Sequence, residues 1–157
     1  MSPPTADLKA RIRTDLTASM KARDELRSST LRMVLAAIQN AEVAGKQART
    51  LSDDEVVGLV VSEAKKRRES ATAFDDAARP ELADKERAEA QILAEYLPEQ
   101  LDDEAVAALV TQVVAEIGAA GEGMRAMGKV MGRLQPQVHG RADGAAVAAE
   151  VRRQLEA

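Results

Sequence analysis

Phe74 and Tyr96 are the only aromatic residues in this chain of 157, and their scarcity limits the folds that the chain can adopt. Hydrophobic residues still make up 45% of the sequence, so a buried core must be built from alanine, leucine, valine, isoleucine and methionine. These side chains suit close packing between helices better than a β-sandwich, which depends on aromatic and β-branched strands. The composition therefore predicts an all-α protein.

Apolar residues recur at helical spacing along the chain, and this periodicity predicts seven helices. Four are expected at residues 8–20, 25–44, 53–74 and 80–96, and three at 103–117, 125–134 and from 144 onward. Ser52 and Glu55 form a capping box, Asp102 and Asp143 are expected N-caps, and Thr5 is expected to cap the first helix. Pro136 is expected to end the sixth helix.

Pro98 interrupts the helical pattern and places a boundary between two lobes at residues 97–101. The expected architecture has two helical lobes. A four-helix lobe covers residues 1–97 and a C-terminal three-helix bundle covers residues 98–157.

Several classes of site are excluded by residues that the sequence lacks. There is no cysteine, and His139 is the only histidine, so the sequence predicts no metal and no cofactor. Phosphate-loop, HExxH and GxSxG motifs are missing, so no catalytic residue is assigned. No apolar run approaches the length of about 20 residues that spans a membrane, and a cytoplasmic protein without membrane partners is expected.

A stretch without acidic residues runs from Gly123 to Ala142, although the chain has a net charge of −4. It contains five candidate cations: Arg125, Lys129, Arg133, His139 and Arg141. The first three are four residues apart, which places them along one side of the sixth helix. Such a row fits a nucleic-acid phosphate backbone. The alternatives are a solvated helix face or a face that meets acidic groups of the first lobe.

Gly128 and Gly132 lie inside the same expected helix, where each costs about 1 kcal/mol relative to alanine. This cost predicts a close approach at the glycines, by a neighbouring helix or by a nucleic-acid backbone. A second basic cluster, residues 65–68, is interpreted as a solvated part of the third helix because acidic residues surround it.

Three segments of the chain resemble the YqeY family: YLPEQL at residues 96–101, MGKVMG at 127–132 and GRADG at 140–144. Members of this family are similar to the C-terminal tail of the GatB subunit of the tRNA-dependent amidotransferase. The resemblance implies an all-helical fold with two lobes and binding of tRNA. It carries over to Gly128, Lys129, Gly132, Gly140, Arg141, Asp143 and Gly144. Among these, Lys129 and Arg141 become candidate phosphate contacts.

Three functions follow as hypotheses. The first is a tRNA-binding accessory protein. The second is an amidotransferase component, a carbon–nitrogen ligase with glutamine as nitrogen donor, although activity of the chain by itself is not expected. The third is a helical module in which Gly128 and Gly132 dock on an aminoacyl-tRNA synthetase or on amidotransferase subunits.

Overall fold

The computed structural model describes residues 7–157, and within that range all regular secondary structure is helical. The all-α prediction is therefore confirmed. The chain divides into two compact units, Met1–Leu97 and Pro98–Ala157. None of the helices in the described range is both long and apolar enough to cross a membrane.

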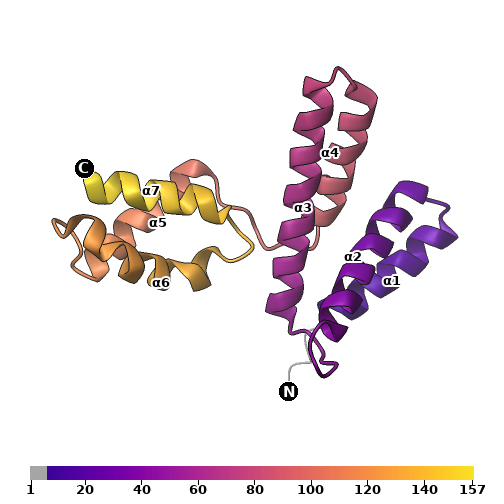
Figure 1. Cartoon of the computed structure of the whole chain (residues 1–157), viewed down its shortest axis with the longest axis horizontal. Helices are drawn as coiled ribbons and strands as arrows, with labels where there is room; N and C mark the ends of the chain where they lie inside the picture. Colours follow the sequence, from indigo (N-terminus) through magenta and orange to yellow (C-terminus); the bar gives the residue numbers. More distant parts are fainter. Residues whose placement is uncertain (1–6) are drawn as a thin grey trace. The chain divides into compact units, whose positions relative to one another are not determined.

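The first unit contains four helices, which pair as two hairpins (Figure 1). One hairpin consists of α1 (Leu8–Lys21) and α2 (Glu25–Val43), and the other of α3 (Asp53–Asp76) and α4 (Pro80–Ala94). The hairpins share an aliphatic core whose most deeply buried members include Ile12, Leu31, Ile38, Val60 and Leu93.

Local hydrogen bonds set the helix starts of the first unit. The predicted capping box is confirmed: the Ser52 hydroxyl accepts from the Glu55 amide at 3.2 Å, and the Glu55 carboxylate accepts from the Ser52 amide at 3.3 Å. Asp7 caps α1 by accepting from the Lys9 amide at 3.0 Å. Thr5, for which this role was predicted, lies outside the described residues.

Tyr96, which follows α4, connects the C-terminal end of that helix to α1 through its side chain. Its hydroxyl donates to the Asp15 carboxylate at 2.5 Å, and the Arg11 guanidinium lies 4.8 Å from the centre of its ring. Burial, together with the hydrogen bond to Asp15, raises the pKa of the Tyr96 hydroxyl. The lone tyrosine of the chain is therefore part of the packing of the first unit.

Arg67 corrects the prediction that residues 65–68 are solvated. Lys65, Lys66 and Arg68 are exposed, but Arg67 is 6% exposed. Its Nη1 donates to Glu63 at 2.9 Å, and its Nε lies 3.5 Å from Glu89 of α4 without a well-aligned hydrogen bond. Glu89 lies 22 residues further along the chain, so the local charge pattern could not reveal this partner.

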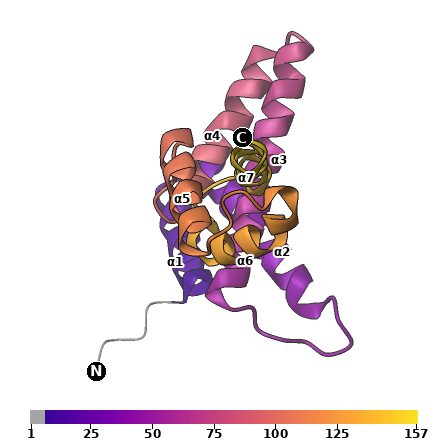
Figure 2. The same ribbon diagram turned by 90° about the vertical axis from the view of Figure 1, so that its left-hand side faces the viewer.

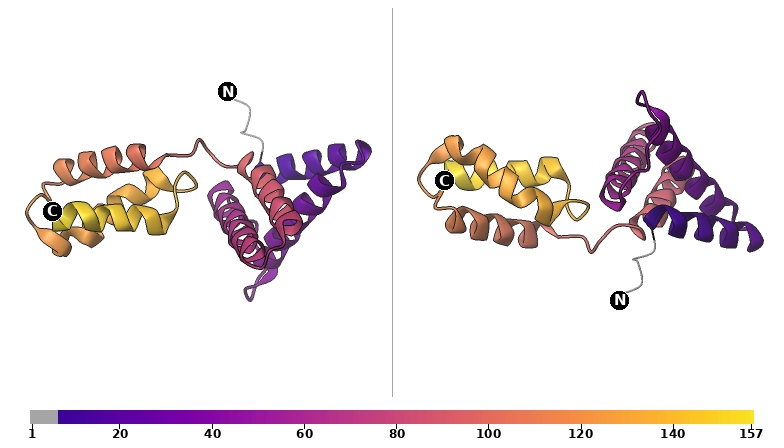
Figure 3. Two further views of the ribbon diagram at one scale, coloured as in Figure 1. Left: turned by 90° about the horizontal axis from the view of Figure 1, so that it is seen from above. Right: turned by 90° about the horizontal axis from the view of Figure 1, so that it is seen from below.

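The second unit contains three α-helices packed together (Figures 2 and 3), and their core is rich in valine. They are α5 (Asp103–Glu116), α6 (Met127–Val138) and α7 (Gly144–Glu156), and a short 3-10 helix, η1 (Gly123–Ala126), precedes α6. Asp102 caps α5 as predicted, by accepting from the Ala105 amide at 2.7 Å. Figure 2 views α7 nearly end-on, with α5 and α6 beside it.

The predicted limits of the sixth helix are wrong at both ends. Residues 125 and 126 belong to η1, and α6 continues through Pro136 to Val138. A proline inside a helix removes one hydrogen bond, here the bond to the Gly132 carbonyl one turn earlier. Because Pro136 lies in the last turn and is exposed, the helix loses little and ends two residues later.

Candidate nucleic-acid interface

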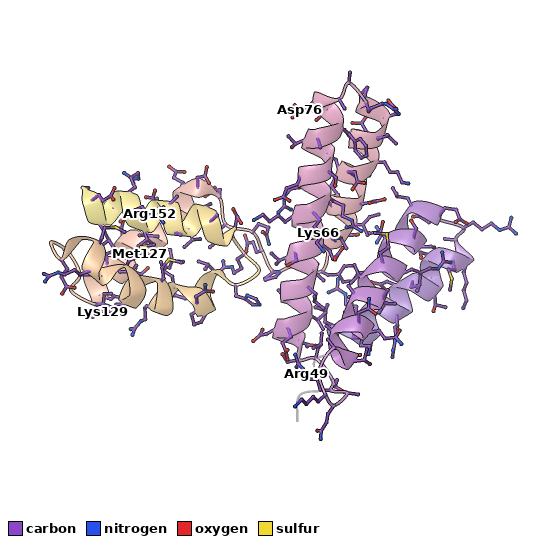
Figure 4. All side chains as sticks on the ribbon, viewed as in Figure 1. Arg49, Lys66, Asp76, Met127, Lys129 and Arg152 are labelled. Atoms are coloured by element: carbon purple, nitrogen blue, oxygen red, sulfur yellow. The ribbon has the colours of Figure 1, made fainter. Side chains whose placement is uncertain are left out.

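Three of the five predicted cations lie on η1 and on the outer side of α6. Arg125 lies in η1, Lys129 and Arg133 lie in α6, and all three are exposed; together they are called the basic row. The opposite side of α6 buries Val130 and Leu134 in the core. Figure 4 shows Lys129 on the outer side of α6 and Met127 toward the other helices of this unit. Burial of the apolar side therefore fixes the direction of the basic row.

The basic row keeps an excess of positive charge. Arg125 and Arg133 form no ion pair with any residue in the range 7–157. Lys129 Nζ lies 3.9 Å from the Glu122 carboxylate, and within the described residues this is the one carboxylate that comes within 4 Å of a cation of the row. The side chains of Lys129 and Glu122 are 70% and 39% exposed, and pairs near the surface at such a distance are weak because water screens them. Glu122 lies immediately before the acid-free stretch and was not included in the sequence prediction.

Gly128 and Gly132 form an open stripe beside the basic row. Both are exposed, and a β-carbon added to either would meet no atom within 4 Å. No other helix of the second unit packs on them, contrary to the first expectation for these glycines. Each glycine directly precedes Lys129 or Arg133, so the stripe and the row follow the same helix turns. An extended ligand could therefore approach the main chain of α6 next to the cations.

Arg141 has a different position from the basic row, because its side chain binds the main chain. Its Nε donates to the Glu99 carbonyl at 3.1 Å and its Nη1 to the Gln137 carbonyl at 3.2 Å. Its own carbonyl accepts from the Leu101 amide at 2.7 Å. These bonds hold residues 98–101 against the loop after α6, and this arrangement is called the linker clasp.

Gly140 completes the linker clasp. Its carbonyl accepts from the Gln100 side-chain amide at 2.7 Å. The residue has a φ of 73°, in the left-handed region that favours glycine. Sequence reasoning missed Glu99 and Gln100 as partners of the GRADG segment, although both belong to the YLPEQL segment that carried the resemblance.

The remaining predicted residues lie at the two ends of the same loop. His139 is exposed and follows α6 as its C-cap residue. Asp143 occupies the predicted N-cap position of α7, but no side-chain capping bond forms there. Gly144 is the first residue of α7, and a β-carbon there would meet no atom within 4 Å.

The basic row and the glycine stripe offer a ligand two kinds of contact, with positive charges and with the exposed main chain of α6. Within residues 7–157, no three or more histidine or carboxylate side chains are grouped so that they could hold a metal ion. The basic row and the glycine stripe therefore define the candidate interface, and the linker clasp supports the loop beside it.

Comparison with known proteins yields a family and several relatives. The model of the YqeY-like protein family matches residues 9–155. A Schizosaccharomyces pombe protein described as uncharacterized is 37% identical over 93 residues, which is 59% of this chain and 74% of that protein.

Two further relatives bear the name altered inheritance of mitochondria protein 41, mitochondrial. The protein from Pyrenophora tritici-repentis is 29% identical over 143 residues, covering 90% of this chain and 76% of its own length. The protein from Clavispora lusitaniae is 30% identical over 106 residues, covering 66% of this chain and 61% of its own length. The family match spans both units, and the chain belongs to the YqeY-like family.

Proposed function

We propose that this protein is a tRNA-binding accessory protein in which the basic row contacts the phosphate backbone. The observation that carries the proposal is the exposure of Arg125 and Arg133 with no carboxylate partner in the described range. Lysine and arginine side chains bind nucleic acid by neutralising phosphates and releasing counterions. The related GatB tail, which binds tRNA, is the basis for naming tRNA as the RNA.

The distribution of charge supports one binding surface in the second unit. This unit contains six lysine and arginine residues against nine aspartate and glutamate residues. Three of the six cations form the basic row, whereas three of the acids, Asp102, Asp103 and Glu104, lie at the start of α5. An RNA should therefore bind on the α6 side, since the net negative charge disfavours binding elsewhere.

The glycine stripe allows close approach, and the scarcity of aromatic residues limits the mode of recognition. A sugar–phosphate backbone can lie against α6 where Gly128 and Gly132 have no side chains. Stacking of bases on aromatic platforms is not available in this unit, which contains neither Phe74 nor Tyr96. The proposed ligand is thus a folded RNA recognised by its shape and backbone.

We assign His139 and Arg141 to the edge of the proposed interface. Both follow the C-terminal end of α6. Arg141 contributes chiefly by holding the loop through the linker clasp, and His139 lies exposed on that loop.

The test is a salt titration of tRNA binding by the full chain. We expect Arg133→Gln to weaken binding and to reduce the slope of log affinity against log salt by about 1, because one phosphate contact is lost. Arg152→Gln is the matched control, since Arg152 is also exposed and belongs to α7. Absence of tRNA binding at low salt, or an equal loss in the control, would overturn the proposal.

The open glycine stripe also favours a second candidate, a docking surface for a helix of an aminoacyl-tRNA synthetase or an amidotransferase subunit. Complex formation that survives ribonuclease and is lost in Gly128→Leu would favour this candidate over RNA binding. If the protein is an amidotransferase component, a partner would have to supply the catalytic residues. Glutamine-dependent amidation by the purified chain would contradict the proposal that the chain has no catalytic centre of its own.

The proposal includes the cellular location of the protein. A tRNA-binding role requires a compartment with tRNA, and the cytoplasm is the place proposed for this chain. The mitochondrial names of two relatives describe those proteins. Fluorescence microscopy of the tagged protein in its own cells checks the location.

A further inference from the structure

The first unit contains a pocket of about 570 Å³ that the RNA-binding proposal does not use. It lies between α1, the C-terminal part of α2 and the segment that joins α2 to α3. Its volume falls in the range of about 300–1,000 Å³ that is usual for small-molecule sites. The pocket is thus large enough for a small organic ligand.

The wall of the pocket contains three cations, Lys9, Arg13 and Arg49, and one carboxylate, Glu42. Lys9 pairs with Glu42 at 2.5 Å, and Arg49 pairs with Glu55 at 2.6 Å. Arg13 forms no ion pair with any residue in the described part of the chain. The pocket therefore has one cation whose charge is not balanced by a direct partner.

Glu42 is held in place by other groups and forms no direct ion pair with Arg13, although the charge of Arg13 contributes to the lowered pKa of Glu42. Its Oε1 accepts from Lys9 Nζ and its Oε2 accepts from the Leu51 amide at 3.2 Å. The side chains of Lys9 and Glu42 are 18% and 12% exposed, so this pair forms part of the wall. These contacts, chiefly the bond from Lys9, lower the pKa of Glu42 and keep it charged at neutral pH.

The rest of the lining combines apolar surface with hydrogen-bonding groups. Leu35, Val43 and Ala48 provide the apolar part. Val43 is 58% exposed, which is high for an apolar side chain. Gln39 and Thr50 provide an amide and a hydroxyl group. An apolar surface with a few polar groups is typical of small-molecule sites, and the unpaired Arg13 among the three cations of the wall favours an anion.

We propose that this pocket binds a small organic anion, whose carboxylate or phosphate group is held by Arg13 and whose apolar body lies against Leu35 and Val43. Carboxylate and phosphate share the charge and the acceptor oxygens that a guanidinium recognises. The site is in the first unit, so it does not depend on the proposed RNA surface of the second unit.

The test is a titration of the ¹⁵N-labelled full chain by NMR with four probes: benzoate, phenyl phosphate, inorganic phosphate and benzyl alcohol. We expect saturable shifts of the Gln39, Val43 and Thr50 amides with benzoate or phenyl phosphate. The tighter of these two probes identifies the preferred anionic group. Equal binding of inorganic phosphate would overturn the role of the apolar wall, and equal binding of benzyl alcohol would overturn the role of the charge.

A pair of variants tests the assignment to Arg13. Arg13→Gln should weaken binding of the better probe about tenfold, equivalent to about 1.4 kcal/mol. Arg32→Gln should leave it unchanged, since Arg32 is an exposed arginine of α2 outside the lining. No saturable shift with either organic anion, or equal affinity in wild type and Arg13→Gln, would overturn the proposal. Neither result alters the tRNA test, which uses variants of the other unit.

Discussion

The two units differ in how they use basic side chains. In the first unit, Arg27, Arg67 and Arg87 pair with carboxylates that lie in another helix or directly after it, at distances of 2.8, 3.5 and 2.7 Å. In the second unit, the basic row has only the 3.9 Å contact between Lys129 and Glu122 within the described residues. These three arginines of the first unit thus connect helical segments, whereas the cations of the basic row face solvent.

This difference shows that the number of charges in a unit says little about their role. What matters is whether packing removes a charge from water. Exposed ion pairs add little to stability, but a buried charge depends strongly on its partners. Arg67 is a buried charge, and the cations of the basic row are exposed charges. Variants of both kinds measure how much each contributes to stability.

The largest effect is expected at Arg67. Arg67→Met should lower the free energy of unfolding by about 3 kcal/mol, because Glu63 and Glu89 lose the charge between them. Urea denaturation followed by circular dichroism measures the change. Lys66→Met is the control and should stay within about 0.5 kcal/mol, since Lys66 is exposed. Similar losses in the two variants would remove the distinction between buried and exposed cations.

A smaller effect is expected at the linker clasp. Arg141→Met removes two bonds from a charged donor to main-chain carbonyls and should destabilise the second unit by about 1–2 kcal/mol. Faster hydrogen exchange of the Leu101 amide should accompany the loss. Arg133→Met should change neither quantity. Equal effects of the two variants on stability and on hydrogen exchange would show that Arg141 is no more important for the loop than a cation of the basic row.

The glycine stripe should respond in the opposite direction. Gly128→Ala and Gly132→Ala should each raise the free energy of unfolding by about 0.5–1 kcal/mol, because alanine favours the helix and the added methyl group meets open space. The same variants should weaken tRNA binding if RNA lies against the main chain. Higher stability with unchanged tRNA affinity would show that the glycines have no part in binding.

The smallest effect concerns Glu89 and pH. Burial raises the pKa of Glu89, so its charged form is disfavoured in the folded protein. Its contribution to stability should therefore increase as pH falls from above this raised pKa toward the usual value for glutamate. Glu89→Gln should abolish this dependence and change stability at neutral pH by less than about 1 kcal/mol.

The pKa of Glu55 is shifted in the opposite direction to that of Glu89, so Glu55 serves as the reference for the pH dependence of stability. The Arg49 guanidinium lowers the pKa of Glu55 to about 2. Its stabilising contribution is complete above the usual glutamate pKa and is lost as pH falls toward that value of about 2. Glu55→Gln should remove this acid-sensitive contribution, and an unchanged acid dependence of stability would contradict the assignment.

Features encoded within a few residues were predictable from the sequence. The capping box at Ser52 and the cap at Asp102 involve side chains and amides three residues apart, and both are confirmed. The apolar spacing of α6 placed Val130 and Leu134 inside, which directed Arg133 and Lys129 outward. Patterns of this kind depend on helix geometry alone.

Features that depend on distant segments were not predictable. Arg67 is buried because α4 brings Glu89 to it and α2 brings Met33, so the local run of charges was misleading. The linker clasp pairs residues about 40 positions apart, as in the bond from Gln100 to Gly140. The pocket lined by Arg13 and Glu42 likewise requires α1 and α2 to be side by side.

The position of Tyr96 determines how this protein can be observed. The chain has no tryptophan and a single tyrosine, so excitation at wavelengths that phenylalanine does not absorb reports on one fluorophore, Tyr96, buried in the first unit. A melting curve recorded by tyrosine fluorescence therefore follows that unit alone, while far-ultraviolet dichroism follows every helix. Recording both signals on one sample would separate the thermal transitions of the two halves without a label or a truncated chain.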